Sequence, residues 1–162
     1  MFSTFQLSDG SLVNCHVMDT AGQERFKAIN EQYYRNADCC LLVYDITSKN
    51  SFEECQNYYN KKLKEYSQKI VKVILLGNKT DKENYREVKP EEGANFAEEN
   101  NYIFMETSCK DNYNVADAFT SLVEMTNVEC KKRGIYTTTK KKTKIDSGKA
   151  AEKASKKGWC CK

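Results

Sequence analysis

The 162-residue sequence has no run of 18 apolar residues, no pair of cysteines at C-x-x-C spacing and a single histidine, His16. The first absence predicts that no helix spans a membrane. The first four residues lack the basic start and apolar block of a secretory signal, so we expect a cytosolic protein. The lack of C-x-x-C spacing argues against a zinc site built from cysteine pairs. His16 lies inside a strand-like stretch and is interpreted as a strand residue.

Eight cysteines are present, but their placement does not suggest a disulfide scaffold. In a reducing compartment we interpret the six internal ones as small apolar residues: Cys15, Cys39, Cys40, Cys55, Cys109 and Cys130. Cys160 and Cys161 lie next to the C-terminus and are considered separately below.

Charge divides the chain into an acidic body and a basic tail. Residues 131–162 contain 12 Lys and Arg against two acidic residues, and residues 1–130 contain 14 basic and 21 acidic residues. Few apolar residues occur after Arg133, so we expect one folded domain over 1–133 and a disordered basic tail over 134–162. Such a tail can meet nucleic acid or an anionic membrane surface.

Strand-like and helical segments alternate along the body. Residues 4–7 and 12–18 flank an Asp-Gly turn and predict a β-hairpin. Apolar runs over 39–45, 70–77 and 102–107 predict strands buried on both faces. Helical spacing covers 51–66, 90–99 and 115–131, with a possible capping box at Ser51 and Glu54 and Pro90 in a first turn. This alternation predicts an α/β fold with a mostly parallel sheet.

Residues 19–26, Asp-Thr-Ala-Gly-Gln-Glu-Arg-Phe, follow the second hairpin strand. A carboxylate there can hold Mg²⁺, a glycine allows close approach of a phosphate, and a glutamine can orient a water for attack. Such sites normally include a loop of the form G-x-x-x-x-G-K-[ST], which this sequence lacks, and only 18 residues precede Asp19.

Polar residues also follow the strands that end near Gly77 and Thr107. In a parallel sheet the carboxyl ends of the strands form the ligand-binding edge. The Asp81 carboxylate can accept two hydrogen bonds from guanine, the Lys79 stem can cover a base, and a backbone N–H near Cys109 can donate to guanine O6. Each segment alone is compatible with an ordinary loop, whereas three at equivalent strand ends indicate a nucleotide site.

Residues 4–130 resemble the later three-quarters of a Ras-superfamily small GTPase, and the Rab branch fits best. The resemblance is carried by the three segments above together with Tyr33-Tyr34-Arg35-Asn36-Ala37 and Leu42-Val43-Tyr44-Asp45-Ile46-Thr47. The resemblance implies a P-loop NTPase-like (Ras-like) α/β fold, a mostly parallel sheet with helices on both faces, missing its first strand and first helix. It places the missing strand between the strand ending at Met18 and the one starting near Cys39. Without that strand we expect exposed apolar faces, and we expect the 162-residue chain alone to bind GTP negligibly and to hydrolyse none.

The same resemblance implies the site. Asp19 would support Mg²⁺ through water, Gly22 would touch the γ-phosphate, and Gln23 would be the catalytic residue that orients water. The base pocket would consist of Asn78, Lys79, Asp81, Ser108, Cys109 and Lys110. Cys109 stands where the family usually has alanine, and Met18 where Rabs usually have an effector-facing tryptophan.

Cys160-Cys161-Lys162 is similar to the double-cysteine ends on which Rabs receive two geranylgeranyl groups, the alternative being two thiols that carry no lipid. Two lipids and a basic tail would anchor the protein to a membrane. Nucleic acid is the weaker partner for the tail, because Tyr136 and Trp159 are its only aromatic residues.

The function that the resemblance implies is a GTP/GDP-binding switch in vesicle traffic, on the cytosolic face of an endomembrane. Its partners would be effectors, an exchange factor, a GTPase-activating protein, and the escort and geranylgeranylation machinery. The alternative is a non-enzymatic, membrane-tethered interaction protein that binds no nucleotide.

Overall fold

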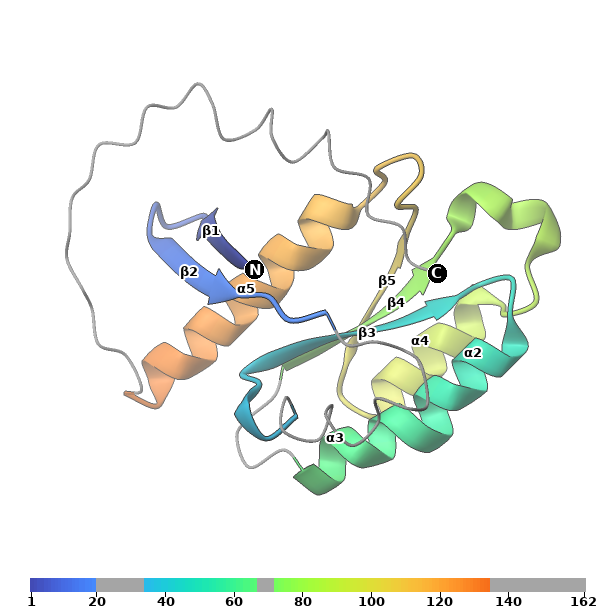
Figure 1. Cartoon of the computed structure of the whole chain (residues 1–162), viewed down its shortest axis with the longest axis horizontal. Helices are drawn as coiled ribbons and strands as arrows, with labels where there is room; N and C mark the ends of the chain where they lie inside the picture. The colour runs from blue at the N-terminus through green and yellow to red at the C-terminus, as the bar shows by residue number, and fades with distance from the viewer. Residues whose placement is uncertain (20–33, 67–71, 135–162) are drawn as a thin grey trace.

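A computed structural model describes residues 1–19, 34–66 and 72–134 and contains two separate sheets (Figure 1). The first is the predicted hairpin of β1 (Phe2–Gln6) and β2 (Leu12–His16), which pair antiparallel. Gly10 closes the turn with φ of +77°, a value that glycine adopts without steric cost. The Asp-Gly signal therefore identified the turn correctly.

The second sheet is parallel and has the order β3 (Cys39–Asp45), β4 (Lys72–Asn78), β5 (Ile103–Thr107). β4 is the central strand and is buried over six consecutive residues, as its apolar run predicted. β3 is not buried on both faces, because the Val43 side chain is 45% exposed. The expectation of full burial was wrong for this strand and also for β5, where Ile103 is exposed.

One long helical segment connects β3 to the region before β4. It consists of α2 (Lys49–Glu54), a π-helical stretch η2 (Cys55–Tyr59) and α3 (Asn60–Tyr66). The helix begins two residues earlier than predicted, because Ser48 is its N-cap and the Ser48 Oγ accepts a hydrogen bond from the Ser51 N–H at 3.3 Å. The predicted capping box at Ser51 was therefore wrong.

Three further helical segments follow along the chain: η3 (Thr80–Tyr85), α4 (Pro90–Glu99) and α5 (Val115–Lys132). Pro90 lies in the first turn of α4, as expected, where its missing N–H costs no hydrogen bond. α5 extends one residue beyond the predicted range.

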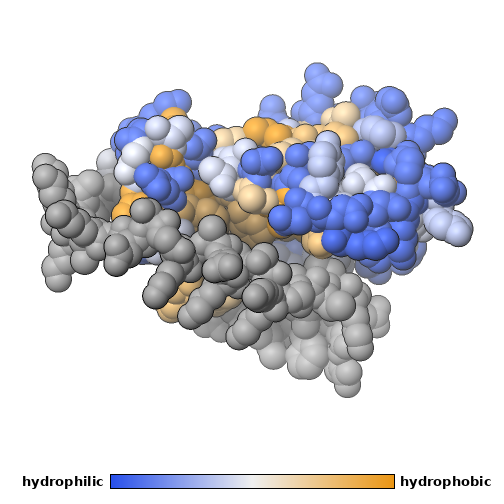
Figure 2. Space-filling view, turned by 90° about the horizontal axis from the view of Figure 1, so that it is seen from above, coloured by the Kyte–Doolittle hydropathy of each residue, from blue (hydrophilic) through white to orange (hydrophobic). Residues whose placement is uncertain are grey.

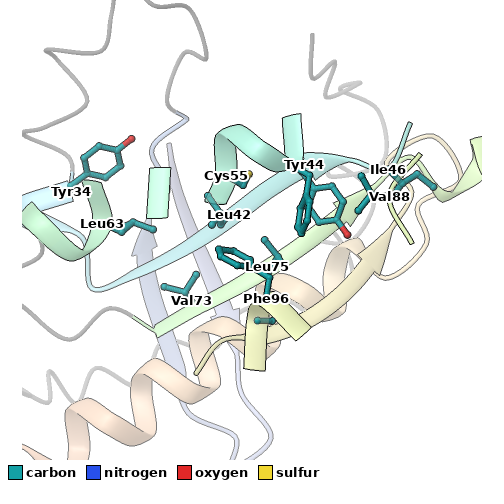
Figure 3. Close-up of a cluster of buried hydrophobic side chains, with 12 residues drawn as sticks. Tyr34, Leu42, Tyr44, Ile46, Cys55, Leu63, Val73, Leu75, Val88 and Phe96 are labelled. Atoms are coloured by element: carbon teal, nitrogen blue, oxygen red, sulfur yellow. The ribbon is translucent and has the colours of Figure 1, made fainter. Parts of the chain in front are cut away.

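Helices cover the parallel sheet on both faces, which confirms the predicted α/β architecture. On one face, α2, η2, α3 and α4 enclose a core around Tyr44, Leu75 and Phe96 (Figure 3). On the other face, Ala118 and Leu122 of α5 pack against Ile74 and Leu76 of β4.

The hairpin lies against α5 and not beside the parallel sheet (Figure 1). Phe5 stacks on Phe119 with ring centroids 6.3 Å apart, and Lys131 pairs with Asp9 at 2.8 Å. In the described part of the chain, no strand joins β2 to β3. Apolar surface gathers in the middle of the molecule, between hydrophilic regions (Figure 2).

Candidate functional site

The carboxyl ends of β4 and β5 bring two of the predicted segments together. Asn78, the last residue of β4, pairs in register with Thr107, the last residue of β5. Its Oδ1 accepts hydrogen bonds from the Thr107 hydroxyl and the Cys109 N–H, both at 3.3 Å. Asn78 is only 5% exposed, so its side chain holds the two strand-end loops together.

Asp81 and Ser108 form the second link between these loops. The Ser108 hydroxyl donates to Asp81 Oδ1 at 2.8 Å, and the Lys110 ammonium lies 3.9 Å from Asp81 Oδ2. The Asp81 side chain is 7% exposed. An ionised carboxylate has about four acceptor positions, so these contacts leave capacity for further donors.

The loop after β5 is closed by backbone contacts. Ser108 and Tyr113 exchange two N–H to O hydrogen bonds of 3.1 and 2.9 Å. Asn112 and Asn114 have φ values of +54° and +55°, a region that asparagine tolerates better than most residues. This tight loop presents the Cys109 N–H toward Asn78. A hydrogen bond from a backbone N–H near Cys109 to guanine O6 stays a prediction.

The Lys79 side chain forms an ion pair that we did not predict. Its ammonium pairs with Asp45 Oδ2 at 2.5 Å, while Asp45 Oδ1 accepts from the Thr47 N–H and hydroxyl at 2.9 and 2.7 Å. Burial alone would raise the pKa of Asp45, but the bonds from Lys79 and Thr47 outweigh it and lower this pKa. The carboxylate is therefore ionised at neutral pH. A strand that ends in Asp-x-Thr is the only signal that could have identified Asp45.

Of the three residues predicted for the phosphate and metal side of the site, the structure describes Asp19, which is exposed beyond the end of β2. Gly22 and Gln23 lie outside the described residues, as do Cys160, Cys161 and the tail from 135 onward. Among the described residues, no group of three or more His, Cys, Asp and Glu side chains is arranged to hold a metal ion. A single carboxylate is compatible with Mg²⁺ that takes its other ligands from phosphates and water.

The internal cysteines are free thiols, and they differ in exposure. Cys55 is buried, which agrees with its interpretation as a small apolar residue, whereas Cys109 is exposed on the site loop. The apolar interpretation was therefore wrong for Cys109. None of the helices in the described ranges is long and apolar enough to cross a bilayer.

Comparison with known proteins agrees with this geometry. The model of the Ras family matches residues 2–128. Rab-26 of Rattus norvegicus is 46% identical over 116 residues, or 72% of this chain and 45% of that protein. Rab-13 of Canis lupus familiaris is 47% identical over 114 residues, or 70% of this chain and 56% of that protein. Rab11B of Nicotiana tabacum is 39% identical over 158 residues, or 94% of this chain and 72% of that protein.

The chain thus spans about half the length of the Rab-26 and Rab-13 proteins that it matches. The family match covers both loops of the candidate site and the whole parallel sheet. The chain therefore belongs to the Ras family and, within it, is of the Rab type.

Proposed function

We propose that this chain is part of a GTP/GDP-binding switch of the Rab type that acts in vesicle and membrane traffic. One observation supports this most directly: Asn78 and Asp81 meet the Ser108-Cys109 loop at the carboxyl ends of β4 and β5. Ligands of open α/β sheets bind at this edge, and the family match covers the same residues.

The chemistry of the pocket favours guanine over adenine. The Asp81 carboxylate can accept from the N1–H and the N2 amino group of guanine, and adenine offers no such pair of donors. A site that hydrogen-bonds a base through buried polar groups rejects bases that leave those groups unpaired. Asp81 is held by Ser108 and flanked by Lys110, so its orientation is set before a base binds.

Asp19, Gly22 and Gln23 would serve the phosphate side. Asp19 would hold Mg²⁺ through water, Gly22 would approach the γ-phosphate, and Gln23 would orient the attacking water. Bound Mg²⁺ supplies charge neutralisation on the phosphate oxygens. The exposed Asp19 carboxylate at the end of β2 is compatible with this role.

Membrane attachment would come from Cys160 and Cys161. Geranylgeranyl groups on both, together with the basic tail, would place the protein on the cytosolic face of an endomembrane. Escort and geranylgeranylation proteins would be needed to add the lipids. Effectors, an exchange factor and a GTPase-activating protein would read and reset the nucleotide state.

The test is an NMR titration of the isotope-labelled full chain with an excess of guanosine, which detects even weak occupation of the base pocket and needs no phosphate contacts. We expect guanosine to shift the amide resonances of Asn78, Asp81 and Ser108, and we expect adenosine to leave them unchanged. Equal responses to both nucleosides, or none at these residues, would contradict the proposal and favour the non-enzymatic interaction protein.

A further inference from the structure

Asp45 lies at the junction between the parallel sheet and the candidate base pocket. It is the last residue of β3 and pairs in register with Asn78 of β4. Its backbone N–H donates to the Ser51 hydroxyl at 3.0 Å, which ties the strand end to α2. The Asp45 carboxylate therefore projects from a position fixed by both the sheet and a helix.

The two oxygens of this carboxylate have separate partners. Oδ1 accepts both hydrogen bonds from Thr47, and Oδ2 binds the Lys79 ammonium. The Thr47 bonds fix the orientation of the Asp45 carboxylate and therefore the position of its Oδ2 atom. The Lys79 ammonium is consequently held beside the end of β3.

The backbone at Lys79 is also unusual. Its φ and ψ of 73° and 39° lie in the left-handed region, which non-glycine residues seldom occupy. Such a conformation persists where surrounding contacts hold it, and it clusters at functional sites. The ion pair with Asp45 is the contact that restrains this side chain.

Lys79 stands two residues before Asp81, the acceptor that the pocket offers to guanine. An ammonium free to turn toward Asp81 would occupy the acceptor positions that the base requires. Asp45 binds that ammonium at 2.5 Å, while Asp81 has the Lys110 ammonium at 3.9 Å. Each lysine of the pocket thus has its own carboxylate.

We propose that Asp45 is a positioning residue for base recognition: it holds the Lys79 ammonium at the end of β3 and so keeps Asp81 available to guanine. This inference rests on the proposed function, and it concerns a residue outside the segments that predicted the site. Asp45 acts through Lys79 and does not itself touch the base.

The test is a double-mutant cycle on the full chain, with guanosine as the probe. Asp45→Asn keeps an Oδ1 acceptor for Thr47 and removes the charge that binds Lys79, so the fold should be retained. We expect guanosine to bind Asp45→Asn about threefold to tenfold more weakly than the wild type. In the Lys79→Met background the same change should have no further effect, because there is no ammonium left to position.

A second readout separates positioning from a structural role. The resonances of the Lys79 side-chain methylenes should broaden or shift in Asp45→Asn, while the melting temperature stays within a few degrees of the wild type. Asp117→Asn, in the exposed first turn of α5, is the matched control and should leave the affinity for guanosine and the Lys79 resonances unchanged.

Three outcomes are decisive. An unchanged affinity in Asp45→Asn overturns the inference and leaves the proposed function intact. An equal loss with and without Lys79 shows that Asp45 acts by another route and also overturns it. Absence of guanosine binding by the wild type overturns the proposed function, and the inference fails with it.

Discussion

The Ser108 hydroxyl donates to Asp81 Oδ1 at 2.8 Å and joins the loop after β5 to the loop after β4. Ser108 is 1% exposed, so this bond is shielded from water. A shielded bond to a charged group is stronger than a neutral one at the surface. Because this bond occupies an acceptor position on Oδ1, it determines which acceptor positions of the Asp81 carboxylate remain for a ligand.

Replacing Asp81 by asparagine should change which base is bound. Asp81→Asn turns one carboxylate oxygen into an NH₂ donor, which opposes the N2 amino group of guanine but matches the C2 carbonyl of xanthine. We expect the affinity for guanosine to fall about tenfold to hundredfold, from the loss of a charge-assisted hydrogen bond. Titration with guanosine and xanthosine measures both changes.

Glu98→Gln, on the exposed side of α4, removes one negative charge away from the site and serves as the control for the Asp81 variant. It should bind guanosine as the wild type does. A weaker response to guanosine without any gain for xanthosine would mean that Asp81 is only a structural link to Ser108.

Replacing Cys109 by alanine should leave base recognition intact. The contact that Cys109 makes with Asn78 comes from its backbone N–H, and its thiol is exposed. We expect the affinity of Cys109→Ala for guanosine to be within about twofold of the wild type, because surface substitutions of this kind usually change free energies by less than about 0.5 kcal/mol. A larger loss would assign the thiol itself to the site.

Adding one methyl group at Gly93 should destabilise the fold. An alanine Cβ there would lie 2.6 Å from both the Tyr44 Oη and Phe104 Cε2. The Tyr44 ring cannot withdraw, because it is 2% exposed and packs against Phe52 at 4.8 Å between centroids. Overpacking costs about 1–3 kcal/mol, which exceeds the gain of about 0.5–1 kcal/mol from alanine in a helix. Urea unfolding measures the net loss.

Tyr44→Phe tests the same contact from the other side. The Tyr44 hydroxyl is buried and has no hydrogen-bond partner in the described part of the chain, so its removal should leave stability unchanged or raise it by up to about 1 kcal/mol. Combined with Gly93→Ala, it should recover part of the lost stability. An additive result would show that Phe104 alone causes the overlap.

Cys55 should make stability fall at alkaline pH. Burial, with smaller effects of Cys40 and Glu54, raises the pKa of Cys55 from its ordinary value of 9.0 to about 12. Above pH 9 the unfolded chain loses this proton and the folded chain keeps it, so the free energy of unfolding decreases as pH rises toward 12. The stability difference between the wild type and Cys55→Ala should shrink by about 1.4 kcal/mol from pH 8 to pH 10. A constant difference would show that the thiol ionises normally in the folded protein.

Local sequence was sufficient for most elements, and it failed where a side chain had a distant partner. Runs such as 39–45 and the proline at the start of α4 predict their elements, because burial and backbone geometry act within a few residues. The helix cap was assigned to Ser51, whose hydroxyl is in fact engaged by the Asp45 N–H and the Ser48 carbonyl. Ser48 caps the helix instead, through its hydroxyl and the Ser51 N–H.

The site was predictable to a similar extent. Asn78, Asp81 and Ser108 were identified because polar residues after apolar strands indicate the ligand-binding edge of a sheet, and the structure brings them into contact. Asp45 was not identified, since its partner Lys79 belongs to another strand end.

The sequence by itself determined the alternation of strands and helices, the polar residues at the strand ends and the family, because these depend on local composition and order. Tertiary structure alone decided that Lys79 pairs with Asp45 and that the hairpin packs on α5 through Phe5 and Phe119. Both contacts join segments far apart in the chain, and their geometry exists only after the parallel sheet and α5 have packed together.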